Sequence, residues 1–146
     1  IKAAADFGTL LLNGYCSAIS LDAPADTETI HRLELAILQA ARLRFSKTEF
    51  IACPSCGRTL FDLPATLQEV KAAVGHLKDL KIGVMGCVVN GPGEMADADY
   101  GYVGAGRGRV SIYRGKDLIE KNIPREEALA ALIALIKADG RWQAPR

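Results

Sequence analysis

The sequence has no long hydrophobic run, no marked excess of charge of either sign and no N-terminal leader pattern. The apolar stretch ALAALIALI at residues 128–136 is far shorter than the roughly 20 residues that span a membrane. The 18 Lys and Arg residues are nearly balanced by 17 Asp and Glu, which leaves a net charge of +1. We therefore expect neither a membrane segment, nor a signal peptide, nor a nucleic-acid-binding surface.

Sulfur and imidazole ligands are also scarce, because the chain has only four cysteines and two histidines. Without a secretory leader, Cys16, Cys53, Cys56 and Cys87 are expected in a reducing compartment, where thiols act as ligands or catalysts rather than as a disulfide scaffold. Cys16 lies outside the two motifs described below, and we expect it to be a small buried residue. With 49% apolar residues among 146, the chain is long enough for one modest hydrophobic core.

The first 25 residues are expected to be the tail of a preceding domain that is missing from this chain. They read as a helix end followed by buried strands in GTLLLN (8–13) and CSAISL (16–21), whose neighbouring strands would lie in other sequence. Asp26 then offers an N-cap for a connecting helix over residues 26–45.

Residues 46–146 are expected to form one α+β domain. An amphipathic helix separates two short strands, and a hairpin with a second turn at Gly115 precedes a C-terminal helix. The predicted ranges are a strand at 48–52, a helix at 64–77, strands at 81–86, 100–105 and 109–114, and a helix at 124–138. The order β-α-β-β-β-α is typical of a compact α+β fold.

Three cysteines follow the first two of these strands. Cys53 and Cys56, in the motif CPSC, come after the strand at 48–52, and Cys87 comes after the strand at 81–86. If the two strands pair in parallel, connected by the helix between them, their carboxyl ends place three thiols at one edge of the sheet.

The CxxC spacing alone is compatible with a zinc half-site, a thioredoxin-like redox pair or an iron-sulfur site. A thioredoxin-like pair needs a helix that starts at the second cysteine, whereas GRTLFDLP intervenes here. A structural zinc site needs four Cys or His ligands, yet His31 and His76 both sit inside helical patterns.

Glu94 is the candidate for a fourth ligand. The segment NGPGE folds back through glycine and proline turns, and Gly91 and Gly93 allow backbone N–H groups to approach a sulfide or an anion. The simplest alternative is that Glu94 is a solvated loop carboxylate. A hard carboxylate beside three soft thiolates would be an exchangeable ligand, which points to catalysis at an iron.

Two longer stretches carry a resemblance to a known family. CPSCGRTLFDL (53–63) and GVMGCVVNGPGEMADADYGYVG (83–104) closely resemble the C-terminal region of the 4-hydroxy-3-methylbut-2-enyl diphosphate synthases. The resemblance runs from about Phe7 to Trp142, and residues 37–63 are most similar to the large three-domain form of plants and some bacteria. The segment GYCSAIS departs from the pattern of that family.

The resemblance implies a 4Fe-4S cluster held by Cys53, Cys56 and Cys87, with Glu94 as an unusual carboxylate ligand and as the catalytic residue. It implies a fold like the cluster-bearing repeat of sulfite and nitrite reductases. Three further residues inside the motifs are candidates for orienting the substrate or for hydrogen bonding to the cluster sulfurs, namely Ser55, Arg58 and Asn90.

The resemblance also implies an oxidoreductase of the methylerythritol phosphate route to isoprenoids. Such an enzyme converts 2-C-methyl-D-erythritol 2,4-cyclodiphosphate to 4-hydroxy-3-methylbut-2-enyl diphosphate by a two-electron reductive dehydroxylation, with ferredoxin or flavodoxin as electron donor. The diphosphate substrate would be bound jointly with a TIM-barrel domain that is missing here, so this piece alone is expected to be inactive. The expected location is the bacterial cytoplasm, or a plastid for a plant protein.

Two other functions stay open alongside this one. A stand-alone iron-sulfur electron-transfer module would use the same cysteines without needing an exchangeable Glu94. A structural zinc-binding module would use them without iron or sulfide.

Overall fold

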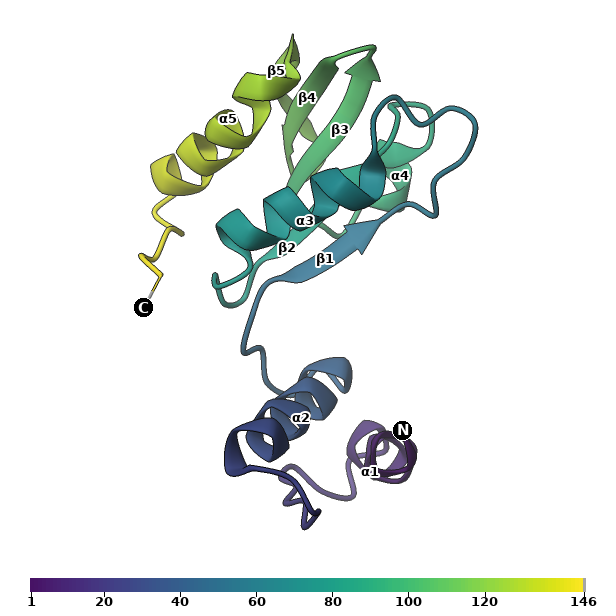
Figure 1. Cartoon of the computed structure of the whole chain (residues 1–146), viewed down its shortest axis with the longest axis vertical. Helices are drawn as coiled ribbons and strands as arrows, with labels where there is room; N and C mark the ends of the chain where they lie inside the picture. Colours follow the sequence, from purple (N-terminus) through teal and green to yellow (C-terminus); the bar gives the residue numbers. More distant parts are fainter. Residues whose placement is uncertain (146) are drawn as a thin grey trace. The chain divides into compact units, whose positions relative to one another are not determined.

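The computed structural model describes residues 1–145. The described chain divides into two compact units, one spanning Ile1–Ser46 and the other beginning at Lys47 (Figure 1). No helix in the described range has both the length and the apolar character that a membrane crossing requires. The assignment of residues 1–25 to a preceding domain stays a prediction.

The first unit consists of two helices, α1 (Lys2–Leu12) and α2 (Thr27–Ala40). The predicted N-cap is confirmed, because the Asp26 carboxylate accepts a hydrogen bond from the Thr29 N–H over 2.8 Å. The α2 helix ends earlier than predicted, and Arg42 adopts a left-handed conformation just after it. The small core of this unit contains Leu11, Ile37 and Ala41.

The two strands predicted in this unit are wrong. Residues 8–12 belong to α1, and residues 16–21 have no regular secondary structure. Of the three consecutive leucines, Leu11 is 3% exposed whereas Leu10 and Leu12 are 43% and 70% exposed, so only one faces the core. Leucine is a good helix former, and no neighbouring strand is available in this unit to pair with an extended segment. Cys16, predicted to be buried, is only partly so.

The second unit is built on one mixed sheet with the strand order β1-β2-β3-β4-β5. The first three strands are parallel to one another, and the remaining pairings are antiparallel. Three helices complete the unit. The strands are β1 (Glu49–Ala52), β2 (Lys81–Met85), β3 (Tyr100–Gly106), β4 (Arg109–Arg114) and β5 (Asp117–Pro124), and the helices are α3 (Leu63–Val74), α4 (Gly91–Glu94) and α5 (Arg125–Ala138). The α+β class and the parallel pairing of β1 with β2 are confirmed, whereas the predicted order lacks α4 and β5, and α3 ends three residues earlier than predicted.

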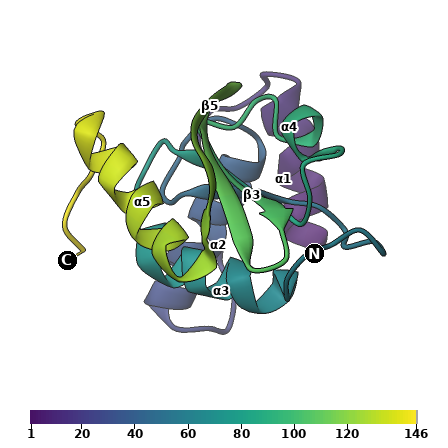
Figure 2. The same ribbon diagram turned by 90° about the horizontal axis from the view of Figure 1, so that it is seen from above.

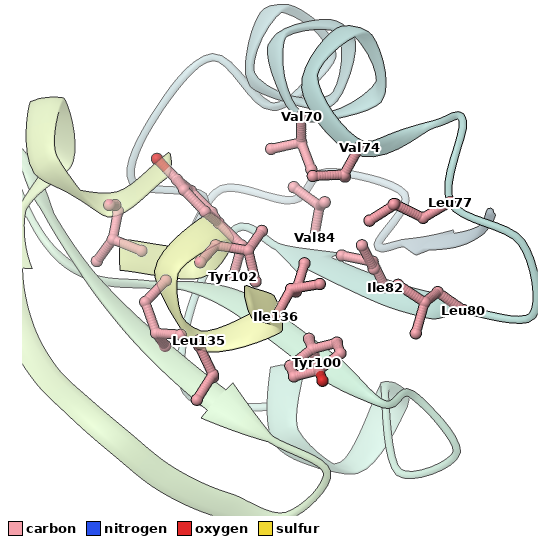
Figure 3. Packing of buried hydrophobic residues seen from close by; sticks show 14 of the residues in the cluster. Val70, Val74, Leu77, Leu80, Ile82, Val84, Tyr100, Tyr102, Leu135 and Ile136 are labelled. Atoms are coloured by element: carbon pink, nitrogen blue, oxygen red, sulfur yellow. The ribbon is translucent and has the colours of Figure 1, made fainter. Parts of the chain in front are cut away.

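The main core lies between the sheet and the helices α3 and α5 (Figure 3). It is formed by side chains that are almost fully buried, among them Val70, Val74, Ile82, Val84, Tyr102, Leu132 and Ile136. Burying each of the aliphatic side chains in this set contributes about 1.5–3 kcal/mol. Local signals agree with this packing, since Asp62 caps α3 by accepting the Ala65 N–H, and Gly108 and Gly115 supply the positive φ of the two hairpin turns.

A second, smaller core lies on the other face of the sheet, where α4 and the turn after it pack (Figure 2). Its buried members include Met85, Met95 and Val103. A Cβ at Gly83 would be 2.7 Å from the Cβ of Met95, and a Cβ at Gly101 would meet the Met95 sulfur. The two glycines therefore let the Met95 side chain lie directly on the sheet. Because Met95 follows Glu94 in the sequence, this packing anchors the chain next to Glu94.

Candidate metal centre

The parallel strands bring the predicted ligands to one edge of the sheet. Ala52 pairs with Val84, so β1 and β2 end nearly level. Cys53 follows β1 directly, and Cys87 comes two residues after the end of β2. The carboxyl ends of parallel strands lie at the same edge of a sheet, as the sequence predicted for these two segments.

All the residues that the sequence singled out line one cavity at this edge. Its volume is about 220 Å³. The four predicted ligands and the three supporting candidates contribute to its wall, namely Cys53, Cys56, Cys87, Glu94, Ser55, Arg58 and Asn90. The structure thus places these seven side chains around a common space, and the ligand role of four of them and the supporting role of the other three stay predictions.

No group of three or more His, Cys, Asp or Glu residues within residues 1–145 meets the geometry for holding a metal ion. The donor set around the cavity, three thiols and one carboxyl group, is compatible with the cysteine-ligated cluster that the sequence predicted, and the identity of the metal stays a prediction. Neither histidine lines the cavity.

Both histidine side chains make their contacts away from the cavity. His31 lies 3.6 Å from Glu34 within α2, and the Nε2 of His76 is 2.7 Å from the carbonyl oxygen of Gln143. The ring of His76 also meets Trp142 edge-on, with the ring centroids 5.4 Å apart. His31 lies inside a helix as predicted, whereas the prediction for His76 is wrong, because α3 ends at Val74 and His76 lies just beyond it.

The first cysteine loop is held by its own backbone and by Thr59. The Cys56 N–H donates to the Thr59 hydroxyl oxygen over 3.1 Å, and the Thr59 N–H donates to the Cys56 carbonyl over 2.9 Å. Ser55 takes a positive φ of 64°, which is uncommon for serine. Sequence reasoning missed Thr59, although a threonine three residues after the second cysteine is a common turn-closing pattern.

Arg58 gives the cavity a local positive charge. Hydrogen bonds from the backbone N–H and the guanidinium of Arg58 hold the pKa of the exposed Cys56 thiol below its ordinary value. The pKa of the Arg58 guanidinium is raised in turn, first by Cys56 and then by Cys87 and Glu94. A thiol beside a fixed cation reaches its thiolate form more easily, and the thiolate is the form that binds metals.

The segment that carries Glu94 is more regular than the predicted loop. Residues 91–94 form the single helical turn α4, in which the Glu94 N–H donates to the Asn90 carbonyl over 2.9 Å. Gly91 is buried, and a Cβ there would be 2.8 Å from the Cβ of Met85. Gly91 is thus required for packing against β2, whereas a Cβ at Gly93 would meet no atom within 4 Å.

Glu94 itself is exposed at the end of this turn. Among the described residues, no hydrogen-bond donor pairs with its carboxylate, and Arg58 is the cation that influences it. Asp99, a nearby acidic residue just before β3, instead accepts the Lys81 N–H over 2.7 Å. Glu94 is therefore the available carboxylate at the cavity.

A mixed-sheet α+β unit with three thiols and one carboxylate around an edge cavity defines a candidate metal-cluster domain. The family described as "GcpE protein C-terminal domain" matches residues 49–138, and the chain belongs to this family. The matched range contains all seven of the residues that line the candidate site and were predicted from the sequence.

Close relatives share one name, "4-hydroxy-3-methylbut-2-en-1-yl diphosphate synthase (flavodoxin)". The chain is 58% identical to the protein of Parabacteroides distasonis over 143 residues, covering 97% of this chain and 23% of the relative. It is 59% identical to that of Bacteroides fragilis, covering 98% and 23%. For Chlorobaculum tepidum the identity is 56%, covering 99% and 19%. The chain thus spans about a quarter or less of the length of these curated relatives.

Proposed function

We propose that this chain is the C-terminal, cluster-binding part of a 4-hydroxy-3-methylbut-2-en-1-yl diphosphate synthase. One observation carries the proposal. In a chain of the GcpE C-terminal domain family, three cysteines and one glutamate from two separate segments line a single cavity. The identity of 56–59% to synthases of that name over almost the whole chain supports it.

The group we propose for this cavity is a 4Fe-4S cluster held by Cys53, Cys56, Cys87 and Glu94. Thiolates are the usual ligands of such clusters, and the donor set here has three of them. When bound, the cluster would supply single electrons and a Lewis-acidic iron. We further propose that the second unit shares the architecture of the cluster-bearing repeat of sulfite and nitrite reductases.

Glu94 is the proposed catalytic residue. Its oxygen donor is the hardest of the four and so the weakest toward a soft, thiolate-bound metal. Its side chain is exposed at the cavity and receives no hydrogen bond from the described residues. With a cluster bound, Glu94 would be its exchangeable ligand, and the released carboxylate would be available to accept a proton.

Arg58 is the proposed partner of the substrate diphosphate. It is the one cationic side chain among the described residues that line the cavity, and it is exposed. A guanidinium presents paired N–H donors that match phosphate oxygens. Ser55 and Asn90 add a hydroxyl and an amide to the same wall, where they can orient a polar substrate.

The activity that we propose for the longer protein is the two-electron reductive dehydroxylation of 2-C-methyl-D-erythritol 2,4-cyclodiphosphate. The names of the relatives support flavodoxin as the electron donor, and ferredoxin is the alternative. A TIM-barrel domain outside this chain would bind the substrate together with Arg58. The proposed location is the bacterial cytoplasm, since the relatives named above are bacterial.

The test uses the full-length enzyme with Glu94→Cys and Glu94→Gln. Both variants should keep most of their iron but lose turnover of the cyclic diphosphate by at least about 100-fold. Glu120→Gln, on an exposed part of β5, is the matched control and should keep full turnover. Full turnover in Glu94→Cys would instead support a pure electron-transfer module.

A further inference from the structure

Gly86 connects the two cysteine segments through its backbone. Its N–H donates a hydrogen bond to the Sγ of Cys53 over 3.3 Å. Its carbonyl oxygen accepts the N–H of Leu60 over 3.0 Å. Gly86 immediately precedes Cys87, so the residue before the third thiol is bonded at both ends to the loop that carries the first two.

The Cα of Gly86 is covered by Thr59. A Cβ added at Gly86 would be 2.7 Å from the Thr59 Cγ2 and 2.8 Å from its Oγ1, closer than real Cβ contacts allow. The same Oγ1 accepts the Cys56 N–H over 3.1 Å and lies 3.4 Å from the Ser55 hydroxyl. Thr59 therefore holds the Cys56 backbone on one side and packs against Gly86 on the other.

Gly104, on the third parallel strand β3, lies against the backbone of Gly86. A Cβ at Gly104 would collide with the carbonyl oxygen of Gly86 and would be 3.0 Å from the ring of Phe61. Gly86 is buried and is contacted by Thr59, by Leu60 and by Gly104 of β3. A side chain at residue 86 would collide with the side chain of Thr59, so the close approach of the two cysteine segments favours glycine there.

We propose that Thr59 and Gly86 form a positioning junction that holds the Cys53–Cys56 loop and Cys87 in register before any cluster binds. This inference rests on the proposed cluster role of the three cysteines. The junction has two effects. It fixes the relative position of three ligands from two segments, and it keeps an N–H donor on the Cys53 sulfur, which favours the reduced state of a cluster bound there.

The first test compares Gly86→Ala with Gly57→Ala after anaerobic reconstitution with iron and sulfide. Gly57 lies in the same loop, and a Cβ there would meet no atom within 4 Å. Gly86→Ala should shorten the half-life of the visible cluster absorption in air by about tenfold and shift the reduction potential to a more negative value. Gly57→Ala should match the parent chain in both measurements. Equal half-lives and equal potentials for Gly86→Ala and the parent would overturn the junction.

A double-variant cycle tests whether the contact itself matters. Thr59→Ala removes the two atoms nearest to the methyl that Gly86→Ala adds. The double variant Gly86→Ala/Thr59→Ala should therefore have the same cluster half-life in air as the single variant Thr59→Ala. Additive losses in the double variant would show that the two residues act independently and would contradict the proposal.

Thr59 substitutions keep the proposal testable even if Gly86→Ala does not fold. Thr59→Ser retains the acceptor for the Cys56 N–H, whereas Thr59→Val retains the shape and loses the acceptor. We expect Thr59→Ser to keep the parent half-life and Thr59→Val to lose most of it, with unchanged far-UV circular dichroism. Identical behaviour of the two variants would overturn the inference while leaving the proposed function intact. Failure of the parent chain to take up iron and sulfide would overturn both the inference and the proposed function.

Discussion

The side chain of Met95 lies directly on Gly83, where a Cβ would be only 2.7 Å from the Met95 Cβ. This contact joins the turn after α4 to the sheet, since Gly83 is the middle residue of β2. Glu94 directly precedes Met95, so the packing of one buried methionine sets where the proposed carboxylate ligand stands.

Met95→Ala should lower the stability of the second unit and loosen the Glu94 segment. Met95 is 1% exposed, and its truncation would leave a cavity on the face of the sheet over Gly83 and Gly101. We expect the free energy of unfolding, measured by urea denaturation, to fall by about 2–5 kcal/mol. Met95→Leu, which nearly conserves volume, should cost less than about 1.5 kcal/mol. Equal losses for the two variants would mean that the site is not tightly packed.

The acid stability of the second unit should depend on Asp139. Burial acts to raise the pKa of this carboxyl, but hydrogen bonds from Tyr100 and Arg114 outweigh it and hold the pKa below its ordinary value. A lowered folded-state pKa contributes stability that is present above the unfolded-state pKa and is lost as the pH falls through the folded-state value.

In urea titrations, Asp139→Asn should therefore lose less stability than the parent chain as the pH falls from above the ordinary carboxyl pKa of 3.8 through the lower folded-state value. Near neutral pH the variant should be less stable, because the two-point pairing with Arg114, at 2.6 and 2.9 Å, is weakened. Parallel stability curves for the two chains would rule out this carboxyl as a source of the acid sensitivity.

Tyr100 should titrate late in alkaline solution. Burial, aided by the hydrogen bond to Asp139, raises the pKa of Tyr100 to about 12. The raised value means that its contribution to stability is complete below the ordinary pKa of 10.0 and is lost as the pH rises toward 12. Tyr100→Phe should remove one late step from the tyrosinate absorbance of the four tyrosines. An unchanged titration curve in Tyr100→Phe would contradict the assignment.

Single cysteine substitutions should separate the ligands from the remaining thiol. Cys53→Ser, Cys56→Ser and Cys87→Ser should each lose most of the iron taken up in anaerobic reconstitution, because a hydroxyl is a poor ligand for these clusters. Cys16→Ser is the built-in control, since Cys16 packs in the first unit and does not line the cavity. A similar loss of iron in Cys16→Ser would point to general damage rather than to ligand removal.

Much of the second unit follows from local sequence signals. The alternation of strand and helix patterns, the N-cap at Asp62 and the turn glycines at 108 and 115 all act within a few residues, so they are readable without the fold. The meeting of Cys53 and Cys87 was also predictable, because a helix that links two short strands favours parallel pairing.

Other features depend on contacts between distant segments and are not visible in the sequence. The leucines of α1 were wrongly predicted as a strand because an isolated apolar run fits either structure. Gly91 was expected to open the backbone to a ligand, yet its lack of a side chain serves packing against Met85. The contact of Thr59 with Gly86 joins segments that only the parallel sheet brings together.

Iron and acid-labile sulfide analysis of an anaerobically reconstituted sample tests the central claim most directly. If Cys53, Cys56, Cys87 and Glu94 hold one cluster, the chain should bind about four irons and about four sulfides and show broad visible absorption. A chain that binds no iron and sulfide, or that takes up a single zinc ion without sulfide, would contradict the claim.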